Sequence, residues 1–366
     1  MDHARGLTAT YDESRRRFLQ SASLAGATVE SHPHPLTGMD GEALAIDVAT
    51  IGPDDAPSVL VIVSGTHGVE GFTGSALQHH WLAHHADDRP AGVRVVLLHA
   101  FNPYGFAWVR RVNEDNVDLN RNFVDWEQPP PANEGYGGIA HLLVPDTWDD
   151  DTQQTTTLQL LAYAEEHGFE RLQAVVSGGQ YSHPTGVFYG GTGPVWSHRW
   201  LDEHLRDLVG AATRVGIVDL HTGLGPWGHG ELISHVGRDD PAYRRGTAWW
   251  GEVRSMVDGE SVSADLSGDW LAAADDLLAD VEVTSAALEY GTVDTVSVLQ
   301  SLRADAVLHA SGEPLGEGAD AVRAQVRAAF ADDDPGWFDA VASRFDEVVG
   351  AALRELGKVP SAGDTP

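Results

Sequence analysis

Two residues with metal-binding side chains, His67 and Glu70, stand three positions apart directly after an apolar segment. Gly65, Gly68 and Gly71 flank them and allow a tight turn, so the imidazole and the carboxylate can face one point. With a second histidine from elsewhere in the chain they complete the His₂Glu set of a catalytic zinc ion, which keeps its fourth position for water. Since the chain has 18 histidines, such a spacing also arises by chance. The position of the pair in the fold must therefore decide whether it binds a metal.

His221 is the natural third ligand, because Asp219-Leu220-His221 ends another apolar segment. A buried histidine bonded to a backbone carbonyl is the alternative interpretation. Glu289 closes a further apolar segment, where a carboxylate either caps the next turn or acts as a general base beside a metal. A second pair with the same spacing, His167 and Glu170, follows an amphipathic helix rather than a strand, and we treat it as a coincidence.

The elements that must position these residues alternate between strands and helices. The sequence predicts strands rich in Val, Ile and Leu at 43–49, 59–63, 94–98, 174–177, 215–220 and 281–289. It predicts helices at 74–85, 158–167, 197–212, 241–257, 319–330 and 337–356. Such alternation is typical of an α/β fold with a mostly parallel sheet covered on both faces, in which sites form at the carboxyl ends of strands. No linker divides the sequence, so we expect residues 1–366 to form one domain.

The composition limits the classes of function. The 366 residues include no cysteine, so a metal must be held by His, Asp or Glu. Lys and Arg number 23 against 55 Asp and Glu, which gives a net charge of −32. A field of that sign repels phosphate and anionic lipid, and no apolar run reaches the roughly 20 residues of a membrane span. We therefore expect neither nucleic acid nor a membrane as a partner. The acidity fits either an arginine-using bacterial protein or adaptation to high salt.

The N-terminal segment Arg15-Arg16-Arg17-Phe18 resembles a twin-arginine export signal. Such a signal needs an apolar core next, whereas Gln20, Ser21 and Ser23 follow here. The same residues fit an amphipathic helix at about 9–26. On this interpretation Arg15-Arg16 is a coincidental match and the protein is cytoplasmic. At the other end, the last residues, about 358–366, are expected to form a frayed tail.

Five blocks of sequence occur in a characteristic order between Ser64 and Thr292. They are His67-Gly68-Val69-Glu70, Asn102-Pro103, Asp118-Leu119-Asn120-Arg121-Asn122, His221 and Glu289. In these blocks the chain resembles the zinc carboxypeptidase superfamily, and within it the deacylase side, the aspartoacylase and succinylglutamate desuccinylase group. The likeness is greatest to a bacterial branch of metallocarboxypeptidase-like proteins that carries a domain-of-unknown-function label. The resemblance implies a three-layer α/β/α fold with a mixed, mostly parallel central sheet.

The resemblance also implies roles for particular residues. His67, Glu70 and His221 would bind one zinc ion per chain. Asp118 would accept a hydrogen bond from the outer imidazole nitrogen of a ligand and so hold its tautomer. Glu289 would take a proton from zinc-bound water, whose pKa the metal lowers to about 7, and return it to the leaving amine.

Four further residues would act on the substrate. Arg111 would stabilise the oxyanion, with Arg110 as the alternative because the spacing from this arginine to Asn120 differs between branches. Asn120 and Arg121 would bind a substrate carboxylate, the arginine in bidentate fashion.

Three aromatic residues would line the substrate site. Tyr181, or alternatively Tyr189, would supply the phenol that carboxypeptidases place near the scissile bond, unless both rings only wall the pocket. Trp227 follows the last metal ligand in a glycine-rich loop and would form an apolar wall.

These residues predict a zinc-dependent hydrolase that cleaves an amide bond in a small N-acyl amino acid or a short peptide with a free carboxylate. A zinc esterase would use the same groups. The alternative from another class is a non-catalytic metal- or ligand-binding protein on the same fold, although binding alone does not require Glu289. A serine hydrolase is disfavoured because no Gly-x-Ser-x-Gly motif occurs. The sequence leaves the oligomeric state open.

Overall fold

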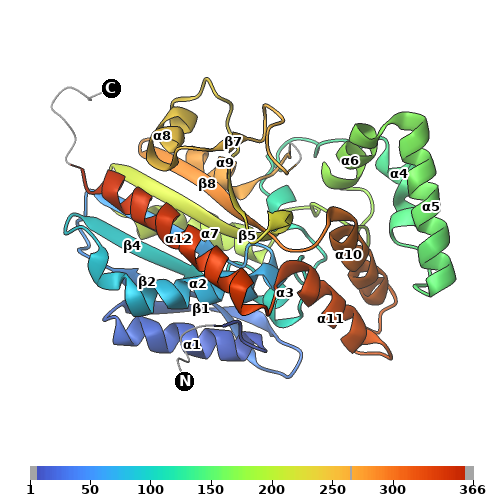
Figure 1. Cartoon of the computed structure of the whole chain (residues 1–366), viewed down its shortest axis with the longest axis horizontal. Helices are drawn as coiled ribbons and strands as arrows, with labels where there is room; N and C mark the ends of the chain where they lie inside the picture. The colour runs from blue at the N-terminus through green and yellow to red at the C-terminus, as the bar shows by residue number, and fades with distance from the viewer. Residues whose placement is uncertain (1–5, 264–265, 359–366) are drawn as a thin grey trace.

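The computed structural model describes residues 6–263 and 266–358. A sheet of eight strands lies at its centre, in the order β1-β2-β4-β3-β5-β8-β6-β7 (Figure 1). Strands β4, β3, β5 and β8 run parallel, whereas β1, β2 and β6 make antiparallel pairs on either side. The predicted mixed, mostly parallel sheet is confirmed. The strands span Thr28–Thr37 (β1), Ala43–Ile51 (β2), Ser58–Ser64 (β3), Val93–His99 (β4), Arg214–Trp227 (β5), Gly230–Ser234 (β6), Arg254–Ser255 (β7) and Glu282–Gly291 (β8).

Helices cover both faces of this sheet, as predicted. One face packs against α1 (Tyr11–Leu24), α2 (Gly71–His84), α8 (Pro241–Trp250) and α12 (Pro335–Leu356), and the other against α7 (Trp196–Val209) and α9 (Trp270–Leu277). Helix α12 crosses the sheet in the foreground of Figure 1. Because neighbouring residues of a strand point to opposite faces, a strand covered on both faces is apolar along its middle, as β3 is from Val59 to Val63. Accordingly, every residue of β3 is buried.

A further group of helices gathers at one end of the molecule, at the right of Figure 1. Their apolar side chains form a separate core around Phe72 and Phe330. This group comprises α4 (Tyr136–Leu143), α5 (Asp150–His167), α6 (Phe169–Ser177), α10 (Thr295–Ala310) and α11 (Ala319–Phe330). The short helix α3 (Pro103–Ala107) and the 3₁₀ turns η1 (Gly68–Glu70), η2 (Ala86–Asp88) and η3 (Leu119–Arg121) complete the described elements.

Five of the six predicted strands are present, and the one at 174–177 is wrong. These residues end helix α6, because Leu172, Val175 and Val176 recur at helical spacing and pack into the separate helical core. A short apolar run does not distinguish a buried strand from one face of a helix.

All six predicted helices are present, but the one at 241–257 is too long. It ends at Trp250, where Gly251 has a φ of 82° and turns the chain toward β7. The sequence did not predict the edge strand β1, which contains two prolines. Proline has no N–H to donate, so it lowers strand propensity everywhere except at such an edge.

The predicted N-terminal helix is confirmed as α1. Thr10 caps it by accepting a hydrogen bond from the Glu13 amide. Phe18 and Ala22, one turn apart, are fully buried. The Phe18 ring stacks on the His99 ring, with centroids 4.5 Å apart. The triple-arginine segment therefore belongs to a helix that packs on the sheet.

Within residues 6–263 and 266–358, no helix combines the length and the apolar character that a membrane span requires. The single-domain organisation and the cytoplasmic location are untested. Residues 359–366 of the predicted frayed tail lie outside the described residues.

Replacing Phe18 tests the packing of α1. Phe18→Ala is expected to lower the free energy of unfolding by about 3–5 kcal/mol, because it removes a buried ring and leaves a cavity. Leu24→Ala is the matched control, since Leu24 lies on the same helix but is 81% exposed, and it should change this free energy by less than about 0.5 kcal/mol. Chemical denaturation measures both values. Equally small effects would contradict the packed position of α1.

Candidate metal centre

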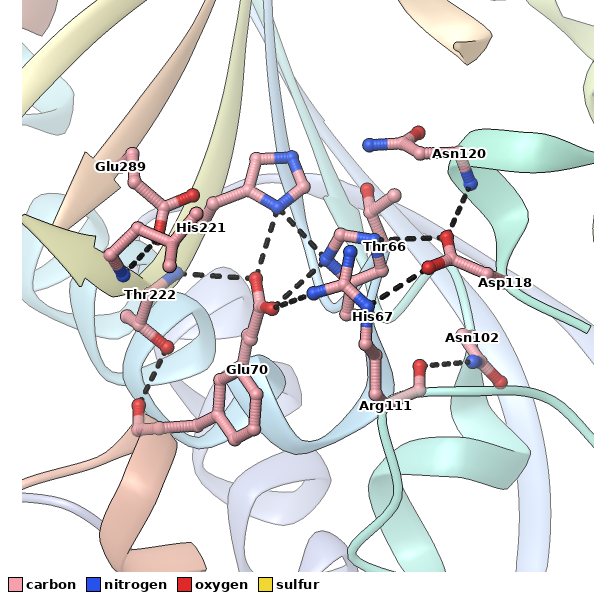
Figure 2. A network of polar contacts seen from close by, with 12 residues as sticks. Thr66, His67, Glu70, Asn102, Arg111, Asp118, Asn120, His221, Thr222 and Glu289 are labelled. Carbon is pink, nitrogen blue, oxygen red and sulfur yellow. Dashed lines mark hydrogen bonds and ion pairs between the residues drawn. The ribbon is translucent and has the colours of Figure 1, made fainter. Parts of the chain in front are cut away.

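The carboxyl ends of three parallel strands bring four predicted site residues together (Figure 2). His67 follows β3 and directly precedes the turn η1, which Glu70 ends. His221 lies in β5, and Glu289 lies in β8. His221 and Glu289 are direct partners in the register of β5 and β8. The parallel order of these strands thus places residues distant in sequence at one edge of the sheet.

The side chains of His67, Glu70 and His221, hereafter the triad, converge on one point. Glu70 Oε1 lies 2.9 Å from His67 Nδ1, Glu70 Oε2 lies 2.9 Å from His221 Nδ1, and the two Nδ1 atoms are 3.2 Å apart. All three residues are buried, with exposures of 3%, 1% and 3%. Donors around a tetrahedral ion with bonds of about 2.0–2.1 Å lie roughly 3.3 Å apart. The triad therefore has close to the spacing of a ligand set.

The turn that carries the first two triad residues requires glycine at two positions. Gly65 has a φ of 70°, in the left-handed region. A Cβ on Gly68 would lie 2.0 Å from the carbonyl carbon of Gly105. The close approach lets the Val69 amide donate to the Arg110 carbonyl at 2.8 Å, which fixes the turn against the neighbouring loop.

The outer nitrogens of both histidines face carboxylates. His67 Nε2 lies 3.3 Å from Asp118 Oδ1, and His221 Nε2 lies 2.6 Å from Asp219 Oδ2. Asp219 accepts a hydrogen bond from His221 Nε2, whereas Asp118 lies at ion-pair distance from His67 Nε2. A proton on Nε2 leaves the Nδ1 lone pair directed at Glu70. Three acceptors then face one point, and acceptors this close repel unless a cation lies among them. The donor set fits a metal ion, and a buried His-x-x-Glu…His triad is typical of zinc carboxypeptidases.

The structure distinguishes the two neighbouring arginines. Arg111 lies against the triad, with Nη1 3.2 Å from Glu70 Oε1 and Nε 2.9 Å from Asp118 Oδ2. Arg110 instead directs Nε toward Asp305 Oδ2, at 2.9 Å, in helix α10. Of the two, Arg111 is the one whose positive charge adjoins the triad.

Glu289 lies beside the triad in a buried position. Its Oε1 accepts a hydrogen bond from the Leu224 amide at 2.9 Å. Burial, and next the negative charge of Glu70, raise the pKa of Glu289 to about 7. A carboxyl group with such a pKa can exchange a proton near neutral pH, which is the property that a general base needs.

The sequence matches a protein family described as "Protein of unknown function (DUF2817)" over residues 7–344. The chain belongs to this family. Among solved structures, bovine thrombin-activatable fibrinolysis inhibitor in complex with tick carboxypeptidase inhibitor has a TM-score of 0.50 at 11% identity, covering 97% of this chain and 99% of that chain. At this identity the likeness shows the fold alone, which is carboxypeptidase-like. The predicted resemblance to the zinc carboxypeptidase superfamily and to a domain-of-unknown-function branch is confirmed.

Two other solved structures are less similar. Carboxypeptidase A from Helicoverpa armigera has a TM-score of 0.47 at 13% identity, covering 88% of this chain and 74% of that chain. A succinylglutamate desuccinylase from Silicibacter sp. TM1040 has a TM-score of 0.39 at 14% identity, covering 78% of this chain and 67% of that chain. A search of the curated proteins finds no match to this sequence.

The predicted carboxylate-binding pair, Asn120 and Arg121, lies in the turn η3. Two guanidinium nitrogens of Arg121 donate to the carbonyls of Asn120 and Ser177, at 3.0 and 2.6 Å. In the described part of the chain, the buried Asn120 Oδ1 and Arg121 Nε have no hydrogen-bond partner. The Phe188 ring lies under both guanidinium groups, 5.3 Å from Arg121 and 5.4 Å from Arg111. Sequence reasoning gave Phe188 no role, because a lone aromatic residue in a loop carries no spacing signal.

The three predicted aromatic residues lie in different surroundings. The Tyr181 hydroxyl donates to the Arg121 carbonyl at 2.6 Å, and burial raises the pKa of Tyr181 to about 12. Tyr189 is buried in the apolar core beneath α7 and α9. Trp227 is half exposed and donates from Nε1 to Asp332 Oδ2 at 2.8 Å. The roles of all three stay predictions.

Asp219 is the residue of this network that sequence reasoning missed. Besides His221, its fully buried carboxylate accepts hydrogen bonds from Thr66 Oγ1 at 2.7 Å and from Trp270 Nε1 at 2.6 Å. The signal was present, because residues two apart on a strand point to the same face. Asp219-Leu220-His221 in a strand therefore places this carboxylate beside the imidazole.

The second His-x-x-Glu pair lies elsewhere. His167 and Glu170 are exposed, at the end of α5 and the start of α6. The His167 ring packs on Tyr163, with centroids 4.4 Å apart. Among the described residues, neither belongs to a group of three side chains that could hold a metal.

Asp219→Asn tests the support of His221. The uncharged amide holds the imidazole proton at Nε2 less firmly, so zinc affinity is expected to fall about 10–100-fold. Asp305→Asn is the control, because Asp305 is an equally buried carboxylate that pairs with Arg110 and contacts no triad residue. Competition with a chromophoric chelator measures both affinities. An unchanged affinity in Asp219→Asn would remove Asp219 from the metal centre.

Proposed function

We propose that the chain is a zinc-dependent hydrolase that cleaves the amide bond of a small N-acyl amino acid or a short peptide with a free carboxylate. The observation that carries this proposal is the buried triad with Glu289 and Arg111 beside it, on a carboxypeptidase-like fold. His67, Glu70 and His221 hold one zinc ion per chain. When bound, zinc acts as a Lewis acid and lowers the pKa of water to about 7.

Two carboxylates orient the histidine ligands. Asp118 and Asp219 each face an Nε2 atom, and both are fully buried and held by further hydrogen bonds. They keep the imidazole protons on the outer nitrogens, so that the Nδ1 lone pairs point inward. The centre is therefore arranged before substrate enters.

Glu289 is the general base. Its position next to His221 in the sheet register lets it accept a proton from the attacking water. The water oxygen then bonds to the amide carbon, the carbon–nitrogen bond breaks, and Glu289 delivers the proton to the leaving amine. A protein that only bound zinc would not need a buried carboxylate such as Glu289 beside the triad.

Two arginines act on the substrate. Arg111, whose guanidinium adjoins both Glu70 and Asp118, stabilises the negative charge that develops on the carbonyl oxygen. Arg121, with Asn120, binds the substrate carboxylate. The pKa of Arg121 is lowered by burial, and a substrate anion offsets the unfavourable burial of this charge. A zinc esterase would use the same residues, so esters belong in a substrate panel.

Metal content tests the zinc centre directly. Purified wild-type protein is expected to contain zinc that His221→Ala loses, since the variant removes one of three ligands. Elemental mass spectrometry, normalised to protein concentration, measures this. His167→Ala is the control, because His167 belongs to the second His-x-x-Glu pair. Loss of zinc in the control alone would show that the ligands are wrongly assigned.

Glu289→Gln separates an enzyme from a binding protein. The variant keeps the zinc ligands, so we expect unchanged zinc content and a fall in kcat of about 10²–10⁴-fold on any N-acyl amino acid or peptide that the wild type cleaves. Glu282→Gln is the matched control, because Glu282 lies on the same strand and is exposed. Unchanged turnover in Glu289→Gln would remove this residue from the mechanism.

A further inference from the structure

A second group of metal-binding side chains lies at the opposite end of α2 from the triad. His80 belongs to the last turns of α2, His85 caps its C-terminus, and Asp346 comes from α12. His80 Nε2 is 3.0 Å from Asp346 Oδ2, and His85 Nε2 is 3.4 Å from the same oxygen. Within the described residues, these three and the triad are the groups of His, Asp or Glu close enough to share one ion.

We propose that His80, His85 and Asp346 form a second site, which binds a divalent transition-metal ion and links the end of α2 to α12. The two nitrogen–oxygen distances lie on either side of the roughly 3.3 Å expected between donors of a tetrahedral ion. Two imidazoles and one carboxylate suit zinc, nickel or copper better than calcium or magnesium, which prefer oxygen ligands.

The tautomer of His85 supports metal binding. Its Nδ1 lies 2.9 Å from Asp88 Oδ2, so the ring proton is held at Nδ1 and the Nε2 lone pair faces Asp346. A lone pair directed at a carboxylate is repulsive unless a cation lies between them. His80 Nε2 lies 3.1 and 3.0 Å from the two oxygens of Asp346, so without an ion it donates a hydrogen bond to this carboxylate. A bound cation would replace that proton, and His80 Nε2 would then be the second nitrogen ligand.

An ion can reach this group from solvent. The side chains of His85 and Asp346 are about one-third exposed, at 33% and 32%, and that of His80 is 12% exposed. Water can complete the coordination. The net charge of −32 raises the local concentration of cations around the whole chain.

The second site does not depend on the first. Helix α2 has 14 residues, which is about 20 Å of length, and the triad lies at its other end. No ligand is shared between the two groups. The second site can therefore exist whether or not the proposed hydrolase function is correct.

Zinc titration in a His221→Ala background tests this site, because that variant disables the triad. We expect one zinc ion per chain by equilibrium dialysis and elemental mass spectrometry, and loss of this ion when His80→Gln and His85→Gln are added. Zinc should raise the unfolding temperature of the first protein and not that of the second, since an ion that binds only the native state stabilises it. Circular dichroism confirms that the variants are folded.

His84→Gln is the matched control, because His84 is an exposed neighbour whose ring centroid lies 5.1 Å from that of His80. It should keep the ion. Absence of zinc binding in His221→Ala, binding that persists without His80 and His85, or loss of the ion in His84→Gln would each overturn the proposal.

The number of zinc ions bound by the wild-type protein, and which variant loses them, distinguishes this proposal from the proposed function. Two ions per chain support both sites. A single ion that disappears with His80→Gln and His85→Gln would support the second site and contradict the zinc hydrolase. A single ion that disappears with His221→Ala would overturn the second site and leave the hydrolase standing.

Discussion

The buried carboxylate of Glu70 is the group on which the whole site depends. One oxygen contacts His67 Nδ1 and Arg111 Nη1, and the other contacts His221 Nδ1 and the Thr222 amide (Figure 2). These partners come from the turn after β3, the loop before η3 and the strand β5. One carboxylate thus sets the relative positions of three segments, and the register that pairs Ser64 at the end of β3 with Leu220 brings His221 to the level of the turn after β3.

Charge balance within the network points to a divalent cation. Two arginines, the partly buried Arg111 and the buried Arg121, face four buried carboxylates. The carboxylates are Glu70, Asp118, Asp219 and Glu289, so the net charge is −2 when all six groups are ionised and the imidazoles are neutral. Buried charge without a partner is strongly destabilising. A doubly charged ion at the triad neutralises the sum, and the raised pKa of Glu289 shows which carboxylate would otherwise take up a proton first.

The sequence was sufficient to locate site residues where their residue types and their position after a predicted strand agreed. Apolar runs located β3, β5 and β8, and the polar residues after or within them gave the triad and Glu289. It left an alternative open between Arg110 and Arg111, because neighbouring residues in a loop point in directions that no spacing specifies. The wrong strand at 174–177 has the same cause, since a short apolar run takes its conformation from the surface on which it packs.

Helix α2 explains why Glu70 is held so firmly. Gln78, which is fully buried in the middle of this helix, donates to the carbonyls of Ile62 and Leu98 and accepts from Ser64, and so bonds α2 to β3 and β4. Glu70 stands directly before the first turn, where the positive end of the helix dipole favours a carboxylate. The anionic ligand is therefore positioned by a helix anchored to the sheet, and a rigid element holds a ligand more accurately than a loop can.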